Sequence, residues 1–163
     1  MIRSAQPSDA EAICEIYNYY VLNTCVTFEE EVVSADEMRK RIKTILEKYP
    51  WVVYEQEGEV IGYAYASEWK SRCSYRYSVE STVYLKQGSQ GKGIGSSLYL
   101  SLLDLLDKKE VHAIIGGIAQ PNEASVALHE KFRFEKVAHF KEVGYKFNQW
   151  IDVGYWEKII QSS

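Results

Sequence analysis

Residues Val83–Ser96 read VYLKQGSQGKGIGS, and this stretch indicates the fold more strongly than any other part of the chain. A strand pattern rich in Tyr, Val and Thr ends here, three glycines follow at alternate positions (Gly91, Gly93 and Gly95), and the apolar face of a helix begins. Glycine permits positive φ and lets a ligand approach the backbone closely. The first turn of a helix has N–H groups without intrahelical partners, and its dipole favours negative charge. The stretch therefore predicts a cradle for a phosphate group, to which Lys92 adds a charged contact.

Three classes of phosphate-binding loop can be compared with this stretch. A Walker P-loop needs Gly-x-x-x-x-Gly-Lys-Ser/Thr, and no window of the sequence fits it. A Rossmann loop needs Gly-x-Gly-x-x-Gly in the first βα unit, with an acidic residue about 20 positions later. Here the glycines are spaced Gly-x-Gly-x-Gly in the middle of the chain, and the region near Ile115 has no acidic residue. Two interpretations remain, a site for the pyrophosphate of another cofactor or a glycine-rich turn that binds nothing.

Length and composition indicate a single globular domain over residues 1–163. Hydrophobic residues make up 46% of the chain and charged residues 26%, which excludes a disordered protein. The formal net charge of −4 argues against general binding to nucleic acid. No apolar stretch approaches the ~18 residues of a membrane helix, and the first residues do not resemble a signal peptide. We therefore expect a cytoplasmic protein that binds neither nucleic acid nor membrane.

The three cysteines, Cys14, Cys25 and Cys73, are widely spaced and match no zinc-binding pattern. We expect free thiols and no metal site.

The pattern of apolar residues predicts a mixed sheet with helices on both faces, in the α/β or α+β class. Two capping boxes, Ser8–Glu11 and Ser34–Glu37, are expected to begin the first two helices. Two further helices are expected over 93–108 and 122–132, and strands over 2–6, 51–55, 60–67, 75–85, 112–118, 135–143 and 151–158. The resulting order is β-α-α-β-β-β-α-β-α-β-β.

Gln90-Gly91-Lys92-Gly93-Ile94-Gly95 resembles the Gln/Arg-x-x-Gly-x-Gly/Ala loop of the GNAT acetyltransferase superfamily. Asn122, followed by Ala124, Ser125, Leu128 and Phe134, resembles the next motif of that superfamily, and the resemblance covers nearly the whole chain. The segments Val79–Tyr84, Ala124–Glu130 and Gly144–Trp156 are similar to the phosphinothricin N-acetyltransferase group. The resemblance implies a mixed, mostly antiparallel sheet of about seven strands with about four helices, and a homodimer.

The resemblance also implies a binding site for acetyl-CoA, with no metal. The loop would hold the pyrophosphate through Gly91, Lys92, Gly93, Ile94, Gly95 and Ser96. The backbone of Val83, Tyr84 and Leu85 would bond the pantetheine arm, which Asn122 would also contact. The reaction would transfer acetyl to the α-amine of a small anionic amino acid, such as phosphinothricin or a methionine sulfone or sulfoximine.

Glu80 is the candidate general base, because an acceptor amine is mostly protonated at pH 7 and must lose a proton before it attacks a thioester. On a regular strand Glu80 would share a face with Arg76, so an ion pair between the two is the alternative. His129 is the second catalytic candidate, for protonating the thiolate or for orienting or deprotonating the amine. The alternative for His129 is a structural histidine near a helix end.

Two residues depart from the superfamily pattern. His129 occupies a position where many members carry Tyr, although the phosphinothricin group also has His. Arg133 stands where a glycine usually ends this helix. Since positive φ costs a non-glycine residue about 1 kcal/mol or more, we expect either a reshaped turn or a strained one.

Lys70, Arg72 and Arg76 form a basic group within an acidic protein, just before the expected catalytic strand. They indicate either a solvated loop or a site for an anionic substrate. The resemblance implies that Lys70, Arg72 and Tyr75 bind substrate and that Phe28 and Val153 line its pocket. Two rival functions are an acetyltransferase for a protein or peptide N-terminus and an acetyl-CoA-binding regulator without catalysis.

Overall fold

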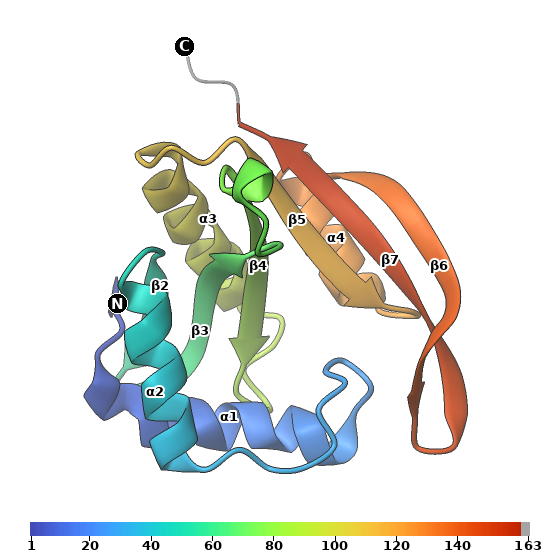
Figure 1. Ribbon diagram of the computed structural model, residues 1–163. Coiled ribbons are helices and arrows are strands. Elements are labelled where there is room, and N and C mark those ends of the chain that lie inside the picture. Colours follow the sequence, from blue (N-terminus) through green and yellow to red (C-terminus); the bar gives the residue numbers. More distant parts are fainter. Residues whose placement is uncertain (161–163) are drawn as a thin grey trace. The chain divides into compact units, whose positions relative to one another are not determined.

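A computed structural model describes residues 1–160 and divides them into two compact units (Figure 1). The first unit comprises Met1–Tyr19, Val33–Ser67 and Ser81–Glu110. The second comprises Tyr20–Val32, Glu68–Glu80 and the chain from Val111 onward. The prediction of one domain over 1–163 stays a prediction, and its last three residues lie outside the described part.

The predicted order of elements is confirmed. Residues 1–160 form seven strands: β1 (Ile2–Ser4), β2 (Trp51–Gln56), β3 (Glu59–Glu68), β4 (Ser78–Leu85), β5 (Ala113–Ala119), β6 (Glu135–Lys146) and β7 (Gln149–Ile159). Four α-helices accompany them: α1 (Ala10–Asn23), α2 (Ala35–Leu46), α3 (Ile94–Asp107) and α4 (Glu123–Lys131). The strand order is β1-β2-β3-β4-β5-β7-β6. The β4–β5 pair is parallel, whereas β1–β2, β2–β3, β5–β7 and β6–β7 are antiparallel, so the sheet is mixed as predicted.

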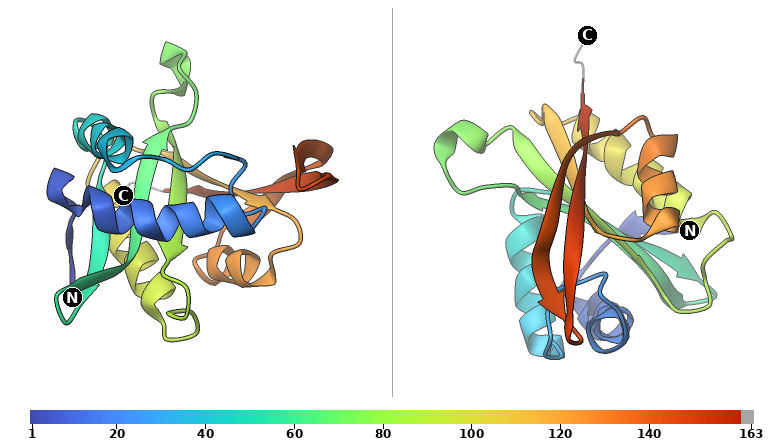
Figure 2. Two further views of the ribbon diagram at one scale, coloured as in Figure 1. Left: turned by 90° about the horizontal axis from the view of Figure 1, so that it is seen from below. Right: turned by 90° about the vertical axis from the view of Figure 1, so that its right-hand side faces the viewer.

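Helices cover both faces of the strands in the first unit. Figure 2 shows α2 and α3 on opposite faces of β2 and β3. Trp51, Val52 and Val53 are consequently all buried, although successive side chains of a strand point to opposite faces. From α3, Leu98, Leu102 and Leu106 are completely buried.

Of the two predicted capping boxes, the cap by Ser34 is confirmed and the cap by Ser8 is wrong. The Ser34 hydroxyl accepts a hydrogen bond from the Glu37 N–H at 3.1 Å, as expected for the start of α2. Ser8 instead lies inside a short 3₁₀ turn, Pro7–Asp9, that precedes α1. There the Asp9 carboxylate accepts from the Gln6 N–H at 2.8 Å and from two nitrogens of Arg3 at 2.9 Å.

The second unit contains β5, β7, β6 and α4, with a long β6–β7 hairpin that extends well beyond the end of β5 (Figure 1). The hairpin is longer than predicted, because Tyr145 pairs with Trp150 and Lys146 with Gln149. Its turn consists of Phe147 and Asn148 with φ of 51° and 60°, and positive φ at both positions is typical of a tight two-residue hairpin turn. No helix within residues 1–160 is long and apolar enough to cross a membrane.

Candidate functional site

The glycine loop of the first unit has the geometry of an anion cradle. Gly88, Gly91 and Gly93 have φ of +90°, +79° and +78°, and no atom lies within 4 Å of where a Cβ would stand on any of them. Gly93 caps the N-terminus of α3 without a side-chain hydrogen bond. The first N–H groups of a helix have no intrahelical partner, and Gly93 has no side chain to cap them. An open, left-handed loop before a helix N-terminus fits a pyrophosphate.

The other predicted cofactor-binding residues near the glycine loop differ in which of their groups a ligand could reach. Lys92 is exposed, whereas the Ile94 side chain is buried in the core and leaves only its backbone for a ligand. Gly95 and Ser96 follow in the first turn of α3. On β4, the residues Val83–Leu85 come after Glu80, the last residue that pairs with β5.

In the second unit, Glu80 lies beside Gly117 and Tyr155. Its carboxylate Oε1 is 3.5 Å, and Tyr155 Cε1 is 3.1 Å, from the position that a Cβ on Gly117 would occupy. Burial raises the pKa of Glu80, and the charge of Lys70 partly offsets this rise. Burial, and then the charge of Glu80, raise the pKa of Tyr155. Glu80 is thus a carboxylate held in partly desolvated surroundings, as a general base requires.

Two further aromatic rings contact the ring of Tyr155. The Tyr155 ring meets the rings of Trp69 and Phe140 edge to face, at centroid distances of 5.8 and 5.7 Å. The Lys70 ammonium lies 4.9 Å from the centre of the Trp69 ring. Sequence reasoning missed Trp69, Phe140 and Tyr155 as site residues, because their positions on separate segments carry no local signal of this cluster.

The alternative partner of Glu80, Arg76, is occupied elsewhere. Its guanidinium donates to the Cys73 carbonyl oxygen at 3.0 Å and lies 4.5 Å from the centre of the Tyr77 ring. Arg76 precedes β4, so the alternation expected along a regular strand does not apply to it. The charge that acts on Glu80 is that of Lys70.

His129 is a buried residue of α4, and its ring is fixed on both sides. Its Nδ1 lies 2.7 Å from the Ser125 carbonyl oxygen, which selects the tautomer with the proton on Nδ1. Its Nε2 lies 2.4 Å from where a Cβ on Gly116 would stand, so β5 needs a glycine here. Burial lowers the pKa of His129, which favours the neutral imidazole.

Asn122 and Arg133, which the sequence singled out, lie at the two ends of α4. The Asn122 side-chain oxygen accepts from the Ser125 N–H at 3.1 Å and caps the helix. Arg133 takes a φ of +67°, so the turn keeps the left-handed conformation and a non-glycine residue bears the strain.

The predicted substrate residues all lie in the second unit. Lys70, Arg72 and Tyr75 are exposed on the segment before β4, and of these Lys70 acts electrostatically on Glu80. Val153 is buried in β7, paired with Ala119 and Phe140. Phe28 lies against the backbone of Gly144. Substrate contacts for these residues stay predictions.

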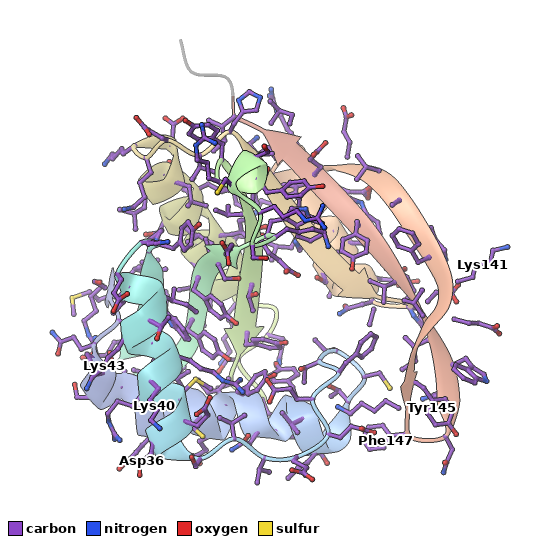
Figure 3. All side chains as sticks on the ribbon, viewed as in Figure 1. Asp36, Lys40, Lys43, Lys141, Tyr145 and Phe147 are labelled. Atoms are coloured by element: carbon purple, nitrogen blue, oxygen red, sulfur yellow. The ribbon has the colours of Figure 1, made fainter. Side chains whose placement is uncertain are left out.

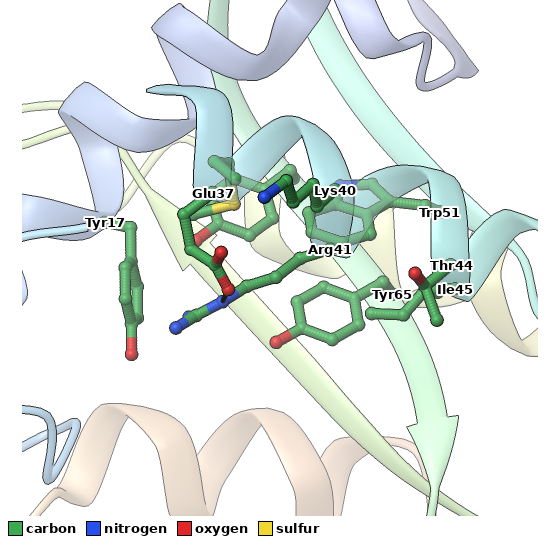
Figure 4. Close-up of a pocket in the computed structure, with 10 residues that line it drawn as sticks. Tyr17, Glu37, Lys40, Arg41, Thr44, Ile45, Trp51 and Tyr65 are labelled. Atoms are coloured by element: carbon green, nitrogen blue, oxygen red, sulfur yellow. Dashed lines mark hydrogen bonds and ion pairs between the residues drawn. The ribbon is translucent and has the colours of Figure 1, made fainter. Parts of the chain in front are cut away.

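A pocket of about 290 Å³ lies in the first unit, and its lining includes none of the predicted site residues (Figure 4). Four aromatic rings and the ion pair of Glu37 with Arg41 line it, the rings being those of Tyr17, Trp51, Tyr63 and Tyr65. Among residues 1–160, no group of three or more His, Cys, Asp or Glu side chains is arranged to hold a metal ion.

Comparison with known proteins places these features in one family. The family model described as an acetyltransferase (GNAT) domain matches residues 2–154. A phosphinothricin N-acetyltransferase of Streptomyces viridochromogenes is 38% identical over 96% of this chain and 86% of its own length. An L-methionine sulfoximine/L-methionine sulfone acetyltransferase of Salmonella typhimurium is 37% identical over 94% of this chain and 91% of its own.

A solved structure agrees with this assignment. An acetyltransferase from Salmonella typhimurium, determined with its cofactor acetyl-CoA, superposes with a TM-score of 0.97 at 35% identity, covering 100% of this chain and 95% of that one. The seven strands, the glycine loop before α3 and the match over 2–154 lead to one conclusion: the chain belongs to the GNAT acetyltransferase family.

Proposed function

We propose that this protein transfers the acetyl group of acetyl-CoA to the α-amine of a small anionic amino acid of the phosphinothricin or methionine sulfoximine type. The observation that carries the proposal is Glu80, a desolvated carboxylate beside Tyr155 and under the influence of the Lys70 ammonium. Relatives that are 37–38% identical act on such amino acids, by their names.

Glu80 takes a proton from the ammonium group of the acceptor, directly or through one water molecule. The neutral amine then attacks the thioester carbonyl, a C–N bond forms, and the C–S bond breaks. The thiolate of CoA takes up the proton that the nitrogen loses as the amide forms. Burial raises the pKa of Glu80, and a carboxylate with a raised pKa is a stronger base. A general base of this kind typically accelerates a reaction ~10²- to 10⁴-fold.

His129 is proposed as an acceptor of a hydrogen bond rather than as an acid. Because its Nδ1 proton is engaged by the Ser125 carbonyl oxygen, its Nε2 carries a lone pair. In this tautomer Nε2 can accept a hydrogen bond from an N–H group and so orient it. His129 cannot donate a proton from Nε2 to the thiolate without first becoming charged, which its burial disfavours.

Acetyl-CoA is proposed to bind to backbone groups of the glycine loop and of Val83–Leu85. The positive φ values, the open space at the glycines and the uncapped start of α3 support this assignment. Asn122 would contact the pantetheine arm through its side-chain nitrogen, since its oxygen caps α4. Lys70, Arg72 and Tyr75 are proposed to bind the acidic groups of the acceptor, with Phe28 and Val153 as pocket walls.

The proposal is tested with a panel of amino acids and analogues, including phosphinothricin, methionine sulfone and a peptide with a free N-terminus, by following thiol release from acetyl-CoA. We expect turnover with the anionic amino acids and a loss of 10²- to 10⁴-fold in kcat for Glu80→Gln, with acetyl-CoA affinity unchanged. Turnover of the peptide alone would overturn the acceptor class. Binding of acetyl-CoA without turnover of any acceptor would favour a regulator.

A homodimer is proposed as the assembly. Several large apolar side chains of the β6–β7 hairpin are more than half exposed, which is unusual for a surface that faces only water. They are Val137, Phe140, Val143, Tyr145, Phe147 and Trp150. Sedimentation equilibrium should give twice the chain mass at micromolar concentration, and Val143→Glu should shift the equilibrium towards the monomer. A wild-type monomer under these conditions would exclude the dimer.

A further inference from the structure

Lys146 is a buried lysine that the proposed chemistry does not use. It lies on β6 of the second unit, and its side chain is 2% exposed. Its ammonium donates a hydrogen bond of 2.8 Å to the carbonyl oxygen of Thr27, which is 119 positions away in the sequence. Thr27 belongs to residues 24–32, which have no helix or strand and connect α1 to α2. Because burying an ammonium is costly, a lysine at this position needs compensating contacts.

The charges around Lys146 come from the same segment. Burial lowers the pKa of Lys146, while Cys25, Glu30 and Glu29 raise it and so favour the ammonium form. The ammonium also lies 5.2 Å from the centre of the Phe147 ring. Residues 24–32 therefore supply both the hydrogen-bond acceptor and the negative charges that stabilise the buried ammonium of Lys146.

A second contact joins the same two pieces of chain. Phe28 packs so closely on β6 that a Cβ at Gly144 would stand 2.4 Å from its Cζ atom. Gly144 and Lys146 are two positions apart on one strand and therefore share a face, and they contact the adjacent residues Phe28 and Thr27. Gly144 has no positive φ, so the ring of Phe28, rather than the backbone conformation, accounts for a glycine there.

The neighbouring strand adds a weaker contact. The side-chain nitrogen of Gln149, at the start of β7, lies 3.6 Å from the sulfur of Cys25. Three residues of the segment thus contact the end of the hairpin.

From these contacts we propose that Lys146 is a positioning residue that holds residues 24–32 against β6 and thereby fixes Phe28 as a wall of the acceptor pocket. The placement of Phe28 in that pocket rests on the proposed function, whereas the docking of the segment does not. The lysine acts through Thr27 and Phe28 and needs no contact with the substrate. It selects acceptors by fixing the width of the pocket at Phe28.

The test compares Lys146→Met with Lys141→Met. Methionine keeps an unbranched side chain and removes the charge and the donor. Lys141 lies on the same strand, is exposed, and projects away from the hairpin (Figure 3), so it is the matched control. For Lys146→Met we expect the KM for the amino acid to rise about 10- to 100-fold, the effect of losing a hydrogen bond to a charged group. The kcat and the KM for acetyl-CoA should stay within about twofold, and Lys141→Met should match wild type in all three.

A second measurement is independent of activity. Hydrogen exchange of residues 24–32 should become at least about tenfold faster in Lys146→Met and unchanged in Lys141→Met. Phe28→Ala should raise the amino-acid KM in the wild-type background and add little in the Lys146→Met background, because both changes remove the same wall. Should Lys146→Met fail to fold, Gly144→Ala takes its place, since its methyl group must displace the Phe28 ring.

The outcomes separate the two proposals. Unchanged exchange of residues 24–32 in Lys146→Met would overturn the positioning role. Faster exchange with an unchanged amino-acid KM would overturn the selection of acceptors. A wild-type protein that acetylates no amino acid would refute the proposed function, while the exchange experiment would still decide whether Lys146 docks the segment.

Discussion

Replacing Gly116 by Ala tests how tightly His129 is fixed. Gly116 is a buried residue of β5 without positive φ, so its backbone would accept alanine. The added Cβ would stand 2.4 Å from Nε2 and 2.7 Å from Cδ2 of His129, whereas ordinary contacts begin at 3.4 Å. The imidazole must therefore move by about 1 Å, away from a ring position that its 2.7 Å contact with the Ser125 carbonyl oxygen now holds.

The expected loss of stability follows from these two contacts. Inserting a methyl group into a packed core typically costs about 1–3 kcal/mol. Losing the histidine hydrogen bond adds about 0.5–1.5 kcal/mol. We expect Gly116→Ala to lower the free energy of unfolding by about 1.5–4.5 kcal/mol, which for a chain of this length is a fall in Tm of about 3–18 °C.

Urea unfolding followed by circular dichroism measures this loss, and a double variant is its control. In His129→Ala the ring is absent, so adding Gly116→Ala should cost little and could refill part of the cavity. The two substitutions should therefore be non-additive by at least about 1 kcal/mol. A Gly116→Ala protein within about 0.5 kcal/mol of wild type, or additive effects in the double variant, would show that the ring is not held against β5.

Three further predictions concern ligands. Gly93→Val and Gly58→Val both place valine at a positive φ, +78° and +79°, with no protein atom within 4 Å of the new Cβ, so the two variants should lose similar stability. Calorimetry should show a loss of acetyl-CoA affinity for Gly93→Val only. Lys70→Met removes the charge that lowers the pKa of Glu80, so that pKa should rise and the acidic limb of the pH profile of kcat/KM should move to higher pH. An acidic limb that stays in place or moves to lower pH contradicts the assignment of Glu80 as the base. Arg72→Ala should reduce kcat/KM about 10- to 100-fold for anionic amino acids and much less for their esters, and equal losses for acid and ester would make the basic group a solvated loop.

Features that depend on a few adjacent residues could be predicted from the sequence. The glycines at 88, 91 and 93 have the positive φ that a glycine-rich loop allows, and Ser34 caps α2 through an N–H three residues away. The hairpin of β2 and β3 turns at Glu57 and Gly58, between the two strands expected over 51–55 and 60–67. Local preferences decide these conformations because all the interacting atoms are close along the chain.

Other local predictions were corrected by distant residues. Ser8 has the spacing of a capping box, yet Asp9 provides the hydrogen bond at that turn. Asp9 is held there by Arg3 of β1, whose Nε in turn donates to Glu55 of β2 at 2.8 Å. The strand expected over 135–143 continues through Gly144 to Lys146, and Phe28 occupies the space that a side chain at position 144 would need.

The groups around the candidate site could be identified only once the pairing of the strands was known. Tyr155 reaches Glu80 because β7 pairs with β5, which places Tyr155 opposite Gly117, while Glu80 pairs with Ile115 two residues earlier on the same strand. Lys146 is buried because Thr27 accepts its hydrogen bond across 119 positions of sequence. The residues next to Tyr155 and Lys146 in the chain do not reveal these contacts, because strand register and the docking of a loop bring the partners together. The energy of a buried charge depends on those partners, and local sequence does not specify them.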